Sequence, residues 1–265
     1  KKPFGVNLIL MHPKLSELIH VCKNQGVGFV VLAGGLPTQP LIDDLKKGEI
    51  KILAFAPNVL FAKKLLRMGI DALVIEGCEA GGHIGPVSTS VLAQEILPQI
   101  RDVPVFVAGG IGRGEAIVEY VRMGAAGVQL GTRFVCAREC IAHPEFKRAF
   151  IRAQARDAVA SIQIDDRFPV IPVRAIHNKA TQAFQEKQRE VISKVDKGEM
   201  ALKDGQLEIE HFWAGALRKA VMEGDVENGS LMAGQSVGLV TKEQSTQDII
   251  NELLDQATTY LHLSI

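Results

Sequence analysis

The sequence predicts an α/β protein whose core is a parallel sheet made of repeated strand–helix units. Short apolar runs alternate with longer amphipathic runs along the first half of the 265 residues. The units repeat roughly every 22 residues, a spacing typical of strands joined by crossover helices. A glycine follows most of the amphipathic runs, at Gly26, Gly48, Gly69 and Gly124, where glycine commonly ends a helix. With 47% apolar residues, the chain can bury one large core.

The expected strands are rich in Val, Ile, Leu and Phe and lack the polar alternation of a half-exposed strand. Such runs fit parallel strands that are buried on both faces. They cover residues 6–10, 29–32, 52–55, 72–75, 105–108 and 127–130.

The amphipathic runs between these strands predict helices, and the pattern changes after residue 132. Helices are expected over residues 14–24, 39–47, 59–68, 90–100 and 115–123, and then over 144–160, 180–200, 209–222 and 246–261. An irregular segment is expected over residues 162–176, and a charged, mobile loop over 194–205. The change divides the chain into an expected barrel over residues 1–143 and a mainly helical subdomain over residues 144–265.

The number of strand–helix units leaves two folds open. A doubly wound sheet can be built from six units, whereas a closed barrel needs eight. Composition does not choose between them.

Composition does exclude several classes of function. The chain has 30 basic and 30 acidic residues, so no general attraction to nucleic acid or anionic membrane is expected. No apolar run is long enough to span a membrane, and no secretory signal opens the chain. Cys136 and Cys140 lack a second pair to complete a zinc site, so no metal is expected. We therefore expect a cytoplasmic protein that acts on a small molecule.

The connection after residue 75 is the longest of the repeat, and it carries the first candidate site. Residues 76–85 contain four glycines and His83. Glycine lets a backbone approach a ligand closely, and a histidine on such a loop can exchange protons near neutral pH. Glu76, at the strand end, is either a carboxylate partner for a cofactor or for His83, or an acid that bonds the backbone.

Two further glycine motifs follow the last two expected strands. Gly109 and Gly110 precede a helix, where backbone amides can bind a phosphate. Gly131 and Thr132 offer an amide and a hydroxyl group after the last strand. In a barrel these motifs would end strands seven and eight, which is the usual phosphate site of that fold. The pair of motifs therefore predicts a phosphorylated cofactor.

Together the motifs resemble the FMN-dependent nitronate monooxygenase family, which includes the FMN-dependent enoyl-acyl-carrier-protein reductases. The resemblance extends over nearly the whole chain and implies a TIM-type (α/β)8 barrel with a helical C-terminal subdomain. On this resemblance residue 7 ends the third barrel strand, so the chain is expected to lack the first two strand–helix units. The matching stretches are Gly5-Val6-Asn7, Glu79-Ala80-Gly81-Gly82-His83, Ala108-Gly109-Gly110-Ile111, Gln129-Leu130-Gly131-Thr132 and Met232-Ala233-Gly234-Gln235.

The resemblance also implies FMN as the cofactor and assigns roles to residues. His83 matches the catalytic histidine, and Met232 is expected to contact the substrate. The expected FMN-binding residues are Asn7, Glu76, Gly81, Gly82, Gly109, Gly110, Gln129, Gly131 and Thr132.

Two activities of the family remain open at this point. Nitronate oxidation with O₂ is expected first, because most chains of this kind are assigned to it. The alternative is an enoyl-acyl-carrier-protein reductase, which would need NADH or NADPH and an acyl carrier protein; Ile84 and residues 173–176 look closer to that branch. A third hypothesis is an inactive barrel fragment. A homodimer is also kept open.

Overall fold

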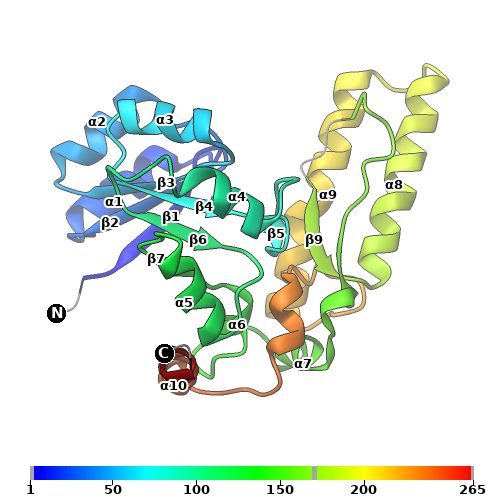
Figure 1. Ribbon diagram of the computed structural model, residues 1–265. Coiled ribbons are helices and arrows are strands. Elements are labelled where there is room, and N and C mark those ends of the chain that lie inside the picture. The colour runs from blue at the N-terminus through cyan, green and yellow to red at the C-terminus, as the bar shows by residue number, and fades with distance from the viewer. Residues whose placement is uncertain (1–2, 169–171, 264–265) are drawn as a thin grey trace. The chain divides into compact units, whose positions relative to one another are not determined.

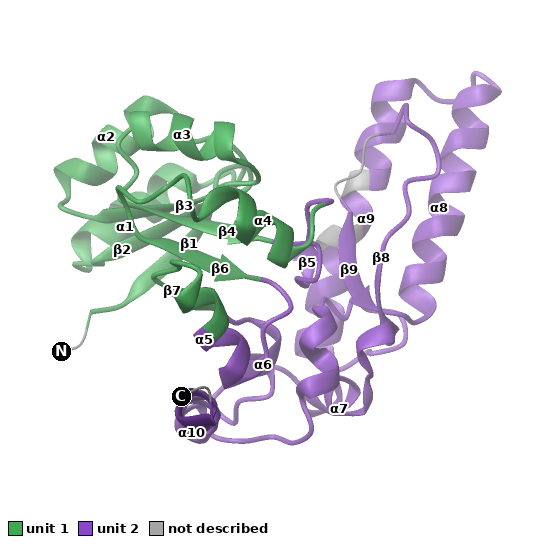
Figure 2. Cartoon of the chain, in the orientation of Figure 1, with its two compact units in different colours: residues 1–76, 87–108, 119–129 green, residues 77–86, 109–118, 130–265 purple. Residues whose placement is uncertain are grey.

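The chain is shown in Figure 1 as a computed structural model that describes residues 3–168 and 172–263. It forms two compact units, which Figure 2 colours separately. Unit 1 comprises Lys1–Glu76, Val87–Ala108 and Glu119–Gln129, and unit 2 comprises Gly77–Pro86, Gly109–Val118 and Leu130–Ile265. The boundary predicted between residues 143 and 144 stays a prediction.

Unit 1 contains a six-stranded parallel sheet in the order β1-β2-β3-β4-β6-β7, which curls into a half-barrel. Each strand lies beside the next strand of this sheet along the chain. This order contradicts a doubly wound sheet, where the strand order reverses, and it agrees with the predicted barrel-type fold. The strands are β1 (Gly5–Ile9), β2 (Phe29–Ala33), β3 (Lys51–Phe55), β4 (Ala72–Glu76), β6 (Val105–Ala108) and β7 (Gly127–Gln129), each within one residue of its prediction.

The helices between the strands bury one face of this sheet. One row of the hydrogen-bonded register is buried throughout, with every side chain at most 4% exposed: Leu8, Leu32, Ala54, Leu73 and Val105. The helices are α1 (Leu15–Asn24), α2 (Gln39–Lys47), α3 (Val59–Arg67), α4 (Thr89–Ile96) and α5 (Gly114–Arg122), which confirms the five predicted helices apart from a shorter α4.

Unit 2 contains a three-stranded antiparallel sheet in the order β5-β9-β8 and most of the chain's long helices. Its strands are β5 (Gly82–His83), β8 (Ala158–Ala160) and β9 (Val173–Ile176). Its helices are α6 (Thr132–Val135), α7 (Pro144–Arg152), α8 (Lys179–Asp196), α9 (Leu202–Glu223) and α10 (Thr246–Leu263), with short 3₁₀ turns η1 (Ala155–Asp157) and η2 (Gln235–Leu239).

Helices α8 and α9 lie side by side and enclose an apolar core (Figure 1). Helix α8 starts at a capping box, in which Asn178 and Thr181 each accept a backbone hydrogen bond from the other. Helix α9 ends at Glu223, and its C-cap residue Gly224 has a φ of +75°. A side chain at Gly224 would also collide with the ring of His143. Both the positive φ and this clash therefore favour glycine at position 224.

Three expectations for the second half of the chain are wrong. The helix predicted over residues 144–160 ends at Arg152, and β8 occupies its last three residues. The segment 162–176, predicted to be irregular, contains β9. The loop predicted over residues 194–205 is mostly the end of α8 and the start of α9. Strands β8 and β9 form by pairing with each other, a non-local interaction that hydrophobic periodicity does not report.

None of the helices in the described residues is both long and apolar enough to cross a membrane.

Candidate functional site

The loop after β4 turns sharply and then forms the short edge strand β5. The amide of Ala80 donates to the carbonyl of Gly77 at 3.1 Å, which closes the turn. A Cβ at Gly81 would lie 2.5 Å from backbone atoms of Ala233 and Gly234, so only glycine fits there. Gly82 has a φ of +81°, a conformation that favours glycine. The loop therefore needs its glycines for its own shape.

His83 stands at the end of this loop, on the edge strand β5. It pairs with Val173 of β9, which fixes its backbone. Its side chain is exposed and makes no hydrogen bond with the part of the chain that the structure describes. The imidazole is therefore available to a substrate, as the predicted catalytic role requires.

The segment Met232–Gln235 contacts both the glycine loop after β4 and Thr132 of the motif after β7. Met232 forms an isolated β-bridge with Ala175 of β9. Its sulfur lies 3.7 Å from where a Cβ at Gly82 would be. The amide of Gln235 donates to the carbonyl of Glu79 at 2.9 Å, and that of Gly234 donates to Oγ1 of Thr132 at 3.0 Å. The structure thus brings Gly81, Gly82, Thr132 and Met232, all predicted site residues, into one neighbourhood of unit 2.

The two predicted phosphate loops also belong to unit 2. Gly109 and Gly110 have φ values of +95° and +73°. The amides of Gly110, Ile111 and Gly112 donate to no recorded acceptor within residues 3–168 and 172–263, so they are available to an anion. At Gly131, a Cβ would meet no atom within 4 Å. Unbonded amides at one loop and open space at the other are both features that a phosphate group requires.

A buried arginine next to this loop was missed by sequence reasoning. Arg133 is 4% exposed and links α6 to η2 and α10. Its Nη1 donates to the carbonyl of Leu239 at 2.7 Å, and its Nη2 donates to Glu252 at 2.7 Å and to Gln244 at 3.1 Å. Glu252 lies 119 positions further along the chain, so no local motif could have indicated the pair.

Three predicted cofactor residues, Asn7, Glu76 and Gln129, belong to unit 1. Glu76, Ala108 and Gln129 form one row at the carboxyl ends of β4, β6 and β7. Asn7 is in register with Ala72, four residues before Glu76 on β4. The structure therefore gathers Glu76 and Gln129 at the strand ends, and it places Asn7 in a different row of the register.

Glu76 is the one acid of this row, and its surroundings change its protonation. Burial raises the pKa of its carboxyl group from 4.5 to about 7. The carboxyl group has no recorded hydrogen bond or ion pair in the described residues. At pH 7 the protein therefore holds both protonated and ionised Glu76, and the protonated form can donate a hydrogen bond.

The raised pKa of Glu76 predicts a pH-dependent stability. Between pH 4.5 and about 7 the folded protein keeps a proton that the unfolded chain has lost, so the free energy of unfolding falls as the pH rises. At pH 8 we expect the free energy of unfolding of Glu76→Gln to exceed that of the wild type by about 2–3 kcal/mol. At pH 4 we expect the two free energies of unfolding to be nearly equal. Urea unfolding at both pH values measures this. A difference that does not change with pH would contradict the assigned pKa.

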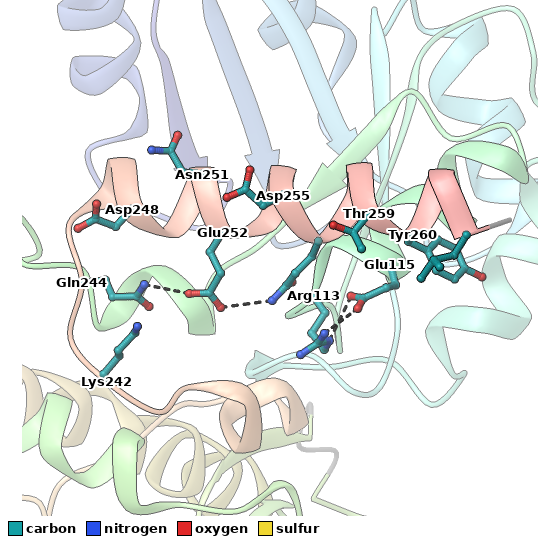
Figure 3. A pocket seen from close by; sticks show the side chains of 12 residues that line it. Arg113, Glu115, Lys242, Gln244, Asp248, Asn251, Glu252, Asp255, Thr259 and Tyr260 are labelled. Carbon is teal, nitrogen blue, oxygen red and sulfur yellow. Dashed lines mark hydrogen bonds and ion pairs between the residues drawn. The ribbon is translucent and has the colours of Figure 1, made fainter. Parts of the chain in front are cut away.

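Unit 2 also has an open pocket of about 560 Å³ beside α10 (Figure 3). Gln244, Glu252 and Asp248 line it, together with Arg113, which is paired to Glu115. None of the predicted catalytic or cofactor residues lines this pocket. Its size alone therefore does not make it the functional site, and the glycine loops remain the candidate.

Comparisons with known proteins bear on the family of the chain. The solved structure of FabK from Thermotoga maritima, an enoyl-acyl-carrier-protein reductase, is 33% identical with a TM-score of 0.86, and the match covers 99% of this chain and 78% of that one. A carboxyl-CoA dehydrogenase of Rhodococcus jostii is 26% identical over 97% of this chain and 78% of its own length. A probable nitronate monooxygenase of Staphylococcus saprophyticus is 29% identical over 94% of this chain and 68% of its own length. The family model described as nitronate monooxygenase matches residues 3–256, and the chain therefore belongs to that family.

Proposed function

We propose that the chain is an FMN-dependent oxidoreductase that uses the glycine loops of unit 2. The observation that carries the proposal is the set of unbonded amides at residues 110–112. Amides of residues 110–112 are unbonded within the described chain, and the space at Gly131 is open. These residues fit the phosphate of FMN, which is small, anionic and rich in acceptors. Bound FMN would supply two-electron transfer between a reductant and an acceptor.

The chain's own residues would bind and polarise the substrate. His83 has an exposed imidazole fixed on β5, so it would donate a hydrogen bond to a substrate oxygen. Gly81 and Gly82 would let the loop backbone lie against a flat ring, because neither carries a side chain. Met232, beside Gly82, would contact the substrate with its flexible thioether.

Of the two activities, we infer that reduction of an enoyl thioester with NADH or NADPH is the better supported. The sequence alone favours nitronate oxidation, whereas two relatives favour reduction of an enoyl thioester. FabK, an enoyl reductase, is 33% identical, and the Rhodococcus relative is named for a CoA thioester. An acyl carrier protein or CoA would then carry the substrate. Nitronate oxidation with O₂ stays the second candidate, favoured by the family's description and by the Staphylococcus relative.

Anaerobic mixing of the purified protein with a nicotinamide or a nitronate distinguishes these two activities. The purified protein is expected to be yellow, and NADH or NADPH is expected to bleach the flavin absorbance within seconds. Crotonyl-CoA should then restore the absorbance without O₂. Bleaching by propyl-2-nitronate and not by either nicotinamide would favour the monooxygenase instead. A protein that binds no FMN at micromolar concentration would refute the proposed cofactor and would favour the inactive-fragment hypothesis.

A further inference from the structure

The short turn η2 packs on the loop of unbonded amides in unit 2. A Cβ at Gly112 would lie 2.7 Å from Cδ1 of Leu239 and 3.3 Å from Cβ of Ser236. Both side chains belong to η2 (Gln235–Leu239). The loop 110–112 and η2 are therefore in direct contact, and Ser236 lies at this contact.

The residue that precedes η2 contacts the second glycine motif. Gly234 is the N-cap residue of the turn, and its amide donates to Oγ1 of Thr132 at 3.0 Å. Ser236 is thus part of a short segment that contacts both motifs expected to bind the phosphate. A donor on this segment can act together with the amides of residues 110–112.

Ser236 carries a hydroxyl group that the described residues do not use. The residue is 8% exposed, and its oxygen has no recorded hydrogen bond within residues 3–168 and 172–263. Polar groups at such buried positions are normally hydrogen-bonded, because an unpaired one costs free energy. The unused hydroxyl group therefore indicates that a bound molecule completes it.

The hydroxyl group of Ser236 is also accessible. A second serine of unit 2, Ser230, is 1% exposed, and its oxygen is fully buried without a partner. In the described chain, the fully buried side-chain atoms that lack a partner are Oγ of Ser230 and Nε of Arg133. Because Oγ of Ser236 lacks a partner and is not among them, the small surface that Ser236 keeps includes its hydroxyl group.

We propose that the hydroxyl group of Ser236 donates to the phosphate of bound FMN and makes the site select FMN over riboflavin. This inference rests on the proposed function and adds a side-chain donor to the backbone amides of residues 110–112. A phosphate monoester offers three charged acceptor oxygens, and hydrogen bonds to charged acceptors are the strong ones. Riboflavin has the same ring system and no phosphate, so it gains nothing from this donor.

The affinities of the full chain for FMN and for riboflavin test this inference. Quenching of flavin fluorescence measures both dissociation constants once bound flavin has been removed. Ser236→Ala is expected to raise the Kd for FMN by about 10–100-fold, the scale of one hydrogen bond to a charged group, and to leave the Kd for riboflavin unchanged. A general structural defect would weaken the binding of both flavins and leave the ratio of their affinities unchanged.

The matched control is Ser230→Ala, which removes an equally unpaired hydroxyl group that no ligand can reach. We expect it to leave both dissociation constants unchanged. The inference is overturned if Ser236→Ala keeps the wild-type preference for FMN, or if its affinities for the two flavins fall equally.

A failure of the proposed cofactor gives a different result. A wild-type protein that binds neither flavin would refute the proposed function, and the inference with it. A wild-type protein that prefers FMN, together with a variant that keeps this preference, would refute the inference alone. If Ser236→Ala does not fold, Ser236→Cys replaces the hydroxyl group by a weak donor and is expected to show the same loss of preference for FMN.

Discussion

Replacing His83 by alanine is expected to lower turnover by about 10²–10⁴-fold, the usual contribution of one acid–base group, while the FMN content stays unchanged. The imidazole is exposed and has no hydrogen bond in the described residues. Its removal therefore leaves no cavity and no unsatisfied partner. Stopped-flow kinetics and the ratio of flavin to protein absorbance measure the two quantities.

A second substitution separates the two roles open to His83. Glutamine keeps a hydrogen-bond donor and cannot exchange a proton, so His83→Gln should recover part of the turnover if His83 only polarises an oxygen. The control is His211→Ala, which removes another exposed imidazole, on α9, and should leave kcat unchanged. Full activity in His83→Ala would show that the histidine has no catalytic role.

Replacing Gly131 by valine is expected to weaken FMN binding by about 10–100-fold, the cost of overpacking a tight contact, without unfolding the protein. Gly131 has a φ of −104°, so it is not in the left-handed region that favours glycine. A Cβ there meets no protein atom within 4 Å. The Cβ of valine therefore enters open space where we expect the phosphate of FMN, which makes the position a test of the phosphate site.

The matched control for this substitution is Gly215→Val in α9. A Cβ at Gly215 also meets no atom within 4 Å, and no predicted site residue lies on α9. Fluorescence titration with FMN, together with urea unfolding of both variants, measures affinity and stability. Unchanged FMN affinity in Gly131→Val would remove Gly131 from the cofactor site, whereas equal losses in both variants would indicate a general defect.

Strand and helix positions in unit 1 could be predicted well because their signals are local. A parallel strand that is buried on both faces is an uninterrupted apolar run, as in Val105–Ala108. Helix ends are marked by capping residues such as Asn58, whose side chain accepts from the amide of Phe61. Local sequence signals do not predict β8, because Ala158–Ala160 becomes a strand only by pairing with β9.

Some features of the candidate site could likewise be predicted from the sequence, and others could not. Glycine motifs at 81–82, 109–110 and 131 could be found because they follow strands, and their roles toward FMN stay predictions. The burial of the cations at Arg133 and Arg174 could not be predicted from the sequence. Each stands alone among ordinary residues, and each acquires its partners from distant segments: Glu252 for Arg133, and Cys78 and Ala158 for Arg174.

The sequence by itself determined the α/β class, the order of the elements in unit 1 and the family, because periodicity, glycine placement and motif spacing are properties of neighbouring residues. The tertiary structure alone decided which charges are buried and which donors stay unbonded. Burial raised the pKa of Glu76, and folding brought the guanidinium group of Arg174 to the carbonyls of Cys78 and Ala158. Desolvation and pairing depend on contacts between segments far apart in the chain, and such contacts exist only once the chain has folded.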